Sequence, residues 1–337
     1  MNNNKTISIV DIAKLAGVST ATVSHVINRS GRYSKATEEK VKAVIEKYGY
    51  VSNNAAKSLK SSSSHTVGLI IPNINNDFFS TIAVSIEQYF DSMDYALFIC
   101  NTDNDPQKER RYFRKLDSMQ VDGIIVISCQ KMLESDLTSR DVPILLLDRT
   151  PLNAMHLRSV TSDARHGIYM ATKNLVEKGC RKIVFVSSFL ATYVSTNRKD
   201  GYLQAMYEHG LKVDDSAIIQ LPSGSSLINT ETAIVDYLTG GKQIDGIVCT
   251  SDNQAIGAMT GLKRMGLSVP EDVKVFGFDN QIQSRLCTPS LSTIHRQPSL
   301  MGEKAAEILM KLIKKTDNIP QETVINCSLI ERRSTEI

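Results

Sequence analysis

Two patterns of hydrophobic positions divide this chain of 337 residues into a short N-terminal part and a long remainder. In the first fifty residues the apolar side chains recur three and four positions apart, which is typical of helices that bury one face. Further on they form short continuous runs, which are typical of strands covered on both faces. The first pattern predicts a small helical domain, and the second predicts an α/β fold.

The N-terminal pattern predicts two short helices separated by a tight turn. Ser8 can cap the first helix in a capping box with Asp11, and Gly17 can end it in a left-handed conformation. Ser19 can cap the second helix. The apolar arc of that helix comprises Val23, Val26 and Ile27. Its opposite arc is small and polar, available to a partner, and comprises Thr20, Ala21, Ser24 and His25.

A third helix is expected between Ser34 and Gly49. Its predicted buried face comprises Val41, Val44, Ile45 and Tyr48. The three helices fit a helix-turn-helix domain, although they also fit an arbitrary three-helix bundle. Residues 1–66 carry ten basic and four acidic side chains, a net charge of +6, whereas the whole chain is +3 and the rest therefore −3. This asymmetry favours DNA binding, while a charge excess alone would only indicate a solvated face.

The N-terminal residues closely resemble the lactose-repressor (LacI/GalR) family of bacterial transcription regulators, and its ribose- and purine-type members in particular. The matching motifs are Asp11-Ile12-Ala13, Ala16-Gly17-Val18-Ser19, Thr22-Val23-Ser24-His25-Val26-Ile27-Asn28, Lys40-Val41 and Tyr48-Gly49-Tyr50. The resemblance implies a DNA-binding surface of Ser8, Ser19, Thr20, Ala21, Thr22, Ser24, His25, Asn28 and Arg29. Thr20, Ala21 and His25 would read bases, because they can bond to a base edge, touch a thymine methyl and donate to guanine. His25 could instead be an ordinary surface residue.

Residues 52–64 form a polar segment that by itself predicts a flexible linker. The resemblance implies a hinge helix over about residues 53–60 that folds only on DNA. Ala56, Lys57 and Leu59 would then lie in the minor groove, with Leu59 as a wedge between bases. Ser52 stands where many relatives carry proline, which puts a preformed hinge in doubt. An inert tether is the alternative. The expected DNA-binding domain is residues 1–60, followed by a linker over 61–66.

The remainder predicts a periplasmic-binding-protein-like body of two lobes, each with a parallel sheet between helices. The expected strands are residues 67–71, 96–100, 123–127, 143–147, 182–186, 246–249 and 273–278. About 270 residues are too many for one core of this kind. The resemblance implies a first lobe of 67–162 and 291–323, and a second of 163–290 and 324–337. Ligands of open α/β sheets bind beyond the carboxyl ends of strands, so we expect one between the lobes.

Polar and aromatic residues near the strand ends resemble the sugar-binding positions of periplasmic binding proteins. The predicted effector-binding residues are Asn76, Phe78, Phe79, Asp148, Arg149, Arg198, Ser251, Asp279 and Arg296. An aromatic ring can stack on the apolar face of a sugar, while carboxylates and guanidiniums engage its hydroxyls. Alternatives remain for some of these positions. Phe78 or Phe79 could be core, Asp252 could cap the following helix rather than meet a ligand, and Asp148 could pair with Arg149.

The leading hypothesis is a cytoplasmic repressor of a carbohydrate operon that a small sugar such as ribose releases from DNA. The resemblance implies a homodimer on a near-palindromic operator with a central CG step, and dimer surfaces at residues 77–92 and 107–119. The alternatives are a purine corepressor system, or sensing of a sugar acid or sugar phosphate through Arg149 and Arg198. The segment 221–228 lacks the second aromatic that a flat base would favour.

Other function classes find little support in the sequence. Paired carboxylates, a phosphate-binding loop and a Ser-His-Asp pattern are missing, so we expect no enzyme and no cofactor. The six cysteines have no metal-ligand spacing and are typical of a reducing cytoplasm. The sequence shows no signal peptide and no membrane-spanning run, which together with the basic N-terminal part disfavours a transport module.

Overall fold

The computed structural model describes residues 7–27, 30–50, 63–134, 136–188, 193–222 and 227–336. The chain divides into two compact units, residues 1–64 and 65–337, which we call the head and the body. The predicted hinge helix with Ala56, Lys57 and Leu59 lies outside the described residues, as do the predicted DNA contacts Asn28 and Arg29. Among the described residues, no helix combines the length and apolar character that crossing a membrane requires.

The head consists of the three predicted helices, α1 (Ile9–Ala16), α2 (Thr20–Ile27) and α3 (Lys35–Tyr48). Their caps are as predicted at both ends of α1 and of α3. The core comprises Ile12, Ala13, Ala16, Val23, Val26 and Val41. The prediction that Tyr48 is buried is wrong, because its side chain is 45% exposed. Gly49 ends the helix in a left-handed conformation, and the reversed chain packs Tyr50 against the core instead.

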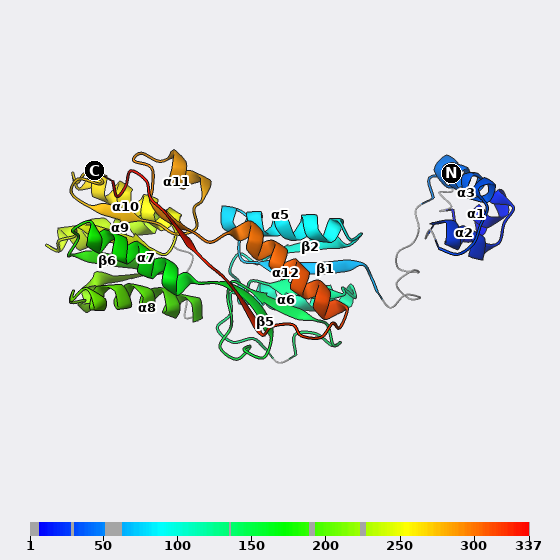
Figure 1. Cartoon of the computed structure of the whole chain (residues 1–337), viewed down its shortest axis with the longest axis horizontal. Helices are drawn as coiled ribbons and strands as arrows, with labels where there is room; N and C mark the ends of the chain where they lie inside the picture. The colour runs from blue at the N-terminus through cyan, green and yellow to red at the C-terminus, as the bar shows by residue number, and fades with distance from the viewer. Residues whose placement is uncertain are drawn as a thin grey trace. The chain divides into compact units, whose positions relative to one another are not determined.

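The first lobe of the body is built on a six-stranded, fully parallel sheet. In spatial order its strands are β11 (Glu322–Ile325), β5 (Arg158–Ser162), β4 (Ile144–Leu147), β3 (Gly123–Val126), β1 (Thr66–Ile71) and β2 (Ala96–Asn101). Helices α5 (Asp77–Asp91) and α12 (Pro298–Ile313) cover one face, and α6 (Pro106–Ser118) packs on the other (Figure 1). The expectation of burial on both faces is wrong for β2. This strand lies at the sheet edge, and Phe98 and Ile99 are 38% and 46% exposed.

The second lobe repeats this architecture with four parallel strands. Their order is β7 (Ile218–Leu221), β6 (Ile183–Ser188), β8 (Gly246–Cys249) and β9 (Lys274–Phe276). Helices α7 (Ala164–Glu177) and α8 (Tyr193–Glu208) share one core cluster with this sheet. Helices α9 (Leu227–Thr239) and α10 (Asp252–Arg264) share the other. The predicted α/β body with two parallel sheets is therefore confirmed.

Three chain segments connect the lobes (Figure 1). One joins β5 to α7, and the others follow β10 (Thr293–His295) and β11. Strand β10 pairs antiparallel with β12 (Ser328–Ile330), so two of the segments lie side by side. The predicted boundary between residues 323 and 324 falls inside β11, which pairs with β5 as far as Ile325. The other lobe boundaries stay predictions.

Candidate functional site

The polar arc of α2 is the candidate DNA-reading surface of the head. Thr20, Ala21 and His25 are exposed, while Val23 is fully buried on the opposite arc. A Cβ at Gly31 would lie 2.7 Å from the His25 Nδ1, so the glycine leaves room for the imidazole. Thr22 and Ser24 are partly buried. The arrangement presents short side chains on a helix whose other face is locked in a core, which suits insertion into a major groove.

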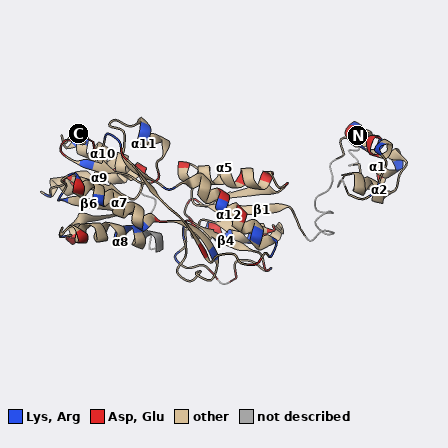
Figure 2. Cartoon of the chain, in the orientation of Figure 1, with Lys and Arg blue, Asp and Glu red and all other residues tan. Residues whose placement is uncertain are grey.

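Two predicted DNA contacts also act as helix caps. The Ser8 hydroxyl lies 2.6 Å from an Asp11 carboxylate oxygen, and the Ser8 backbone N–H donates to the same oxygen at 3.0 Å. The Ser19 hydroxyl accepts a bond from the Thr22 backbone N–H at 3.1 Å. Both serines are exposed, so they remain accessible to phosphate oxygens. Acidic and basic positions are interspersed over the helices of both the head and the body (Figure 2).

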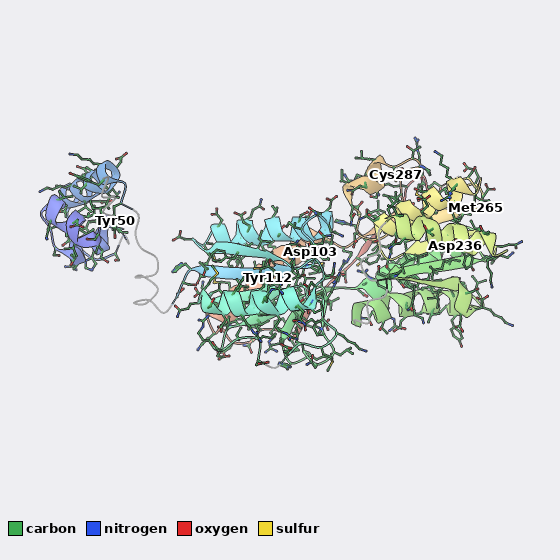
Figure 3. The ribbon with its side chains drawn as sticks, turned by 180° about the vertical axis from the view of Figure 1, so that it is seen from behind. Tyr50, Asp103, Tyr112, Asp236, Met265 and Cys287 are labelled. Atoms are coloured by element: carbon green, nitrogen blue, oxygen red, sulfur yellow. The ribbon has the colours of Figure 1, made fainter. Side chains whose placement is uncertain are left out.

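The candidate effector site lies where strands of both lobes end. Asp148 directly follows β4 with φ +63°, and the Arg149 backbone N–H donates to the Leu147 carbonyl at 2.6 Å. Asp279 follows β9 with φ +108°. Residues other than glycine seldom adopt a positive φ, and those held in this conformation cluster at functional sites. Asp103 follows β2, the outermost strand of the same sheet, and marks the same edge of the first lobe in Figure 3.

Arg296 brings the two strand-end carboxylates together. It lies on the crossing segment after β10, is 2% exposed, and forms ion pairs with Asp148 of the first lobe and with Asp279 of the second at 3.1 Å. Its Nε donates to the Ser162 hydroxyl at 2.9 Å. Burial lowers the pKa of Arg296 to about 10, so it stays charged at neutral pH. The predicted alternative, a pair between Asp148 and Arg149, is not formed, because the tight turn leaves the Asp148 carboxylate against Arg296.

Guanidinium groups cover the aromatic rings of the site. The guanidinium carbon of Arg296 lies 3.9 Å from the centroid of the Phe78 ring, and that of Arg149 lies 5.6 Å from the Phe79 ring. The guanidinium carbon of Arg198 lies 4.4 Å from the centroid of the Phe278 ring. Phe278 is part of a predicted strand and is not among the predicted site residues. Phe78 and Phe79 are both buried in the first-lobe core. A ligand therefore meets cations where the sequence predicted open aromatic faces.

Burial raises the pKa values of two carboxylic acids beside this cluster. Burial raises the pKa of Asp279 to about 8, opposed mainly by the charge of Arg198. Burial likewise raises the pKa of Asp252 to about 7, opposed first by the hydrogen bond from Thr293 at 2.5 Å. The second Asp252 oxygen accepts from the Gln281 backbone N–H at 2.6 Å. At neutral pH the site therefore holds carboxyl groups that readily take up a proton.

Several residues near the site hold the local structure. Asn76 caps α5, and its side-chain oxygen also lies 3.3 Å from Gln281 Nε2 across the lobes. Ser251, rather than Asp252, caps α10, so the expected capping role of Asp252 is wrong. The fully buried Glu109 accepts bonds from Ser128, from the Cys129 N–H and from Gln130, which fixes the segment after β3. The hydrophobic pattern of the sequence could not predict the roles of Glu109 and Gln281, because their bonding partners come from distant segments.

A surface hollow of about 540 Å³ lies elsewhere, between α6 and residues 136–140. It includes Gln120, which precedes β3, and so it lies at the amino ends of the strands. One of its two carboxylates, Asp117, is already bound by Ser139 and Arg140, and the other is Asp136. Ligands of open α/β sheets bind at the opposite edge, so the strand-end cluster is the better candidate site.

Comparisons with known proteins agree with this architecture. A family model described as bacterial regulatory proteins, lacI family, matches residues 8–53, and one for a periplasmic binding protein-like domain matches residues 172–335. The HTH-type transcriptional repressor PurR of Vibrio atlanticus (strain LGP32) is 32% identical over 334 residues, which cover 98% of either chain. PurR of Actinobacillus pleuropneumoniae serotype 3 (strain JL03) is 34% identical over 336 residues, or 97% of this chain and 98% of the relative.

Solved structures show the same fold. The lac repressor dimer bound to operator and the anti-inducer ONPF superposes with a TM-score of 0.87 at 23% identity, over 98% of this chain and 99% of the other. A LacI transcriptional regulator from Alkaliphilus metalliredigens QYMF, complexed with D-xylulofuranose, is 30% identical with a TM-score of 0.69, over 81% and 100% of the two chains. The relatives are transcriptional repressors rather than enzymes, and this chain is likewise a DNA-binding repressor. The chain thus belongs to the lacI family of bacterial regulatory proteins.

Proposed function

We propose that this repressor controls a carbohydrate operon and is released from its operator by a small polar effector bound between the lobes. The observation that carries the proposal is the Arg296 cluster, in which one buried cation joins Asp148 to Asp279. Hydroxyl groups of a ligand could bond to these carboxylates in place of Arg296. The leading effector class is a small sugar, of which ribose is the simplest example to test, and the D-xylulofuranose complex of a relative supports this class.

The cluster also suggests how effector binding in the body could change the affinity of the protein for its operator. Arg296 follows β10 on a chain crossing, so a ligand that replaces its bonds would change how the lobes meet. An effector releases DNA only if it binds the released arrangement more tightly than the DNA-bound one. We propose that the released arrangement separates the two hinge segments of a homodimer, which acts in the cytoplasm, where operator DNA lies.

The DNA-binding surface of the proposed function is the polar arc of α2 with its flanking caps. The bases would be contacted by Thr20, Ala21 and His25. The flanking polar residues would hold the helix or contact the DNA phosphate backbone; they are Ser8, Ser19, Thr22 and Ser24. The operator would be a near-palindrome, since two heads of a dimer read equivalent half-sites. Its predicted central CG step rests on the resemblance of the α2 sequence and Leu59 to purine-type repressors. Selection from a random DNA library by the purified protein tests this directly. A recovered consensus without two-fold symmetry would contradict the proposal.

The dimer would form partly through the exposed apolar side chains of α5 and the neighbouring edge strand. Val84 of α5 is 54% exposed, and Phe98 and Ile99 of β2 add to the apolar surface. This includes the surface expected at residues 77–92 and extends it to β2; the one expected at 107–119 corresponds to α6. We expect Ile99→Lys to shift the protein from dimer to monomer in sedimentation velocity. Tyr207→Lys is the matched control, because it places the same charge at an exposed position outside this surface and should leave the dimer intact.

A purine corepressor is the second candidate, and the relatives named PurR favour it. It would strengthen rather than weaken operator binding. Fluorescence anisotropy of the selected operator, measured with ribose, hypoxanthine or guanine, separates the two. Weaker binding with the sugar supports release, whereas tighter binding with a base supports the corepressor. An operator affinity that no small molecule changes would contradict ligand control itself.

A further inference from the structure

Two arginines of the effector site have hydrogen-bond donors left over. Arg149 donates from Nη1 to the Asn104 side-chain oxygen at 3.4 Å, a long bond, and Arg198 donates from Nη1 to the Thr250 carbonyl at 3.0 Å. The buried Nε of Arg198 has no partner among the described residues. Each guanidinium has five N–H donors, so most of this capacity is unused.

The nearby carboxylates are committed to other groups. Glu109 is close enough to influence the pKa of Arg149, but its oxygens already accept from Ser128, Gln130 and a backbone N–H. Asp279 influences both arginines, yet its ion pair is with Arg296. Within the described ranges neither Arg149 nor Arg198 has an acidic side chain within 4.0 Å. Among the described residues, the site therefore holds one cation with a bound carboxylate, Arg296, and two without one, Arg149 and Arg198.

The two cations lie on opposite sides of the Arg296 cluster and are both partly shielded from water, Arg149 over Phe79 and Arg198 over Phe278. Burial lowers the pKa of Arg149 to about 10, and the charge of Arg198 is the next cause of the shift. Burial lowers the pKa of Arg198 as well. Both guanidiniums remain charged at neutral pH, and like charges that are partly buried and influence each other raise the free energy of the ligand-free protein. An anion bound between them would lower this free energy.

We propose that the effector carries an anionic group, a carboxylate or a phosphate, which Arg149 and Arg198 bind together. This inference rests on the proposed function, because it names the class of ligand for the same site. Hydroxyls of the effector would meet Asp148 and Asp279, so the whole ligand is an acidic or phosphorylated sugar. The cations over Phe79 and Phe278 leave those rings unavailable for stacking a neutral base.

Thermal unfolding of the full chain at constant ionic strength tests the proposal. The probes are inorganic phosphate and two matched pairs: D-glucuronate with D-glucose, and D-ribose 5-phosphate with D-ribose. Ligands that bind the native state raise the midpoint by mass action. The variants are Arg149→Gln and Arg198→Gln. Arg264→Gln is the control, since that exposed side chain on α10 also carries one positive charge.

We expect an acidic probe to stabilise the wild type more than its neutral partner, and either pocket variant to lose on the order of tenfold to hundredfold in affinity. The carboxylate and phosphate arms show which anion the site takes. Without any ligand, both pocket variants should unfold at the same temperature as the wild type or above it, because each removes an uncompensated charge. Arg264→Gln should retain the full response.

Two results would overturn the proposal. One is an equal response of wild type, pocket variants and control to phosphate and to the acidic probes, which would be a general salt effect. The other is stabilisation by a neutral sugar or hypoxanthine that both pocket variants retain. Operator binding, measured on the same preparations, distinguishes a failure of this inference from a failure of the proposed function. Specific operator binding by a protein without an anion response contradicts only this inference, whereas its absence contradicts the proposed function.

Discussion

The reading helix of the head and the strand-end cluster of the body both offer side chains to a ligand, but they hold them differently. Thr20, Ala21 and His25 stand exposed on α2, whose other face alone supports the fold. In the cluster, Asp148 and Arg296 are buried and bind each other across 148 positions of the chain. For these three side chains of the head the proposed function is thus separable from stability, whereas in the body the groups of the proposed effector site also hold the fold.

The largest expected effect breaks the cluster. Arg296→Ala leaves Asp148 buried without its cation, and losing one partner of a buried ion pair costs roughly 3–5 kcal/mol. Asp279 adds little to this loss at neutral pH, because burial raises its pKa to about 8 and it holds a proton. Urea unfolding followed by circular dichroism measures the loss in the full chain. Arg264→Ala removes an arginine that is 66% exposed, and should change stability by less than about 0.5 kcal/mol.

A neutral replacement of the whole cluster sharpens this result. Arg296→Met combined with Asp148→Asn and Asp279→Asn removes the charges together, so much of the lost stability should return. A single Arg296→Ala variant as stable as the wild type would show that the cluster does not hold the lobes in the way its burial indicates.

The pH dependence of the body's stability is the next expected effect. Asp279 has a pKa near 8 in the folded body because it is buried, against roughly 4 in an unfolded chain. Between these values the native state holds a proton that the unfolded state has lost, so the stabilisation is full below pH 4 and disappears as pH rises through 8. The free energy of unfolding should therefore fall from pH 6 to pH 9.

Asp279→Asn tests the origin of this slope. The variant cannot ionise at this position, so its stability should depend less steeply on pH over the same range. Asp252 contributes a weaker dependence of the same sign, since its pKa is raised by burial to about 7. A wild-type stability that rises between pH 6 and pH 9 would contradict both assignments.

In the head, a change of function without a change of stability is expected. His25→Ala removes an exposed imidazole, so the unfolding free energy should move by less than about 0.5 kcal/mol. Operator binding should weaken by about 1–3 kcal/mol if the imidazole contacts a base. Binding to DNA of random sequence is the control and should not change. An equal loss on both DNAs would assign His25 to the phosphate backbone instead.

The same contrast explains how far the sequence predicts the structure. Caps at Ser8 and Ser34 and the left-handed Gly49 are local, because a few neighbouring residues determine them. Strands appear as apolar runs, although the exposure of Ile99 depends on β2 lying at the edge of the sheet. The bonds of Arg296 depend on residues from distant segments, and periodicity carries no record of such pairs. The sequence therefore predicts which residues are in the site better than it predicts which of them bind each other.

The smallest expected effect comes from the Ser8 cap of α1, a local interaction of the head, in contrast to the long-range cluster of the body. Ser8→Ala removes a hydroxyl that accepts from the Asp11 backbone N–H at 3.3 Å, and should destabilise the head by about 1 kcal/mol. Ser8→Thr keeps the hydroxyl and is the control. Because the head and the body are separate units, calorimetry should show a lower head transition and an unchanged body transition. A shift of both transitions would mean that the cap of α1 stabilises more than its own helix.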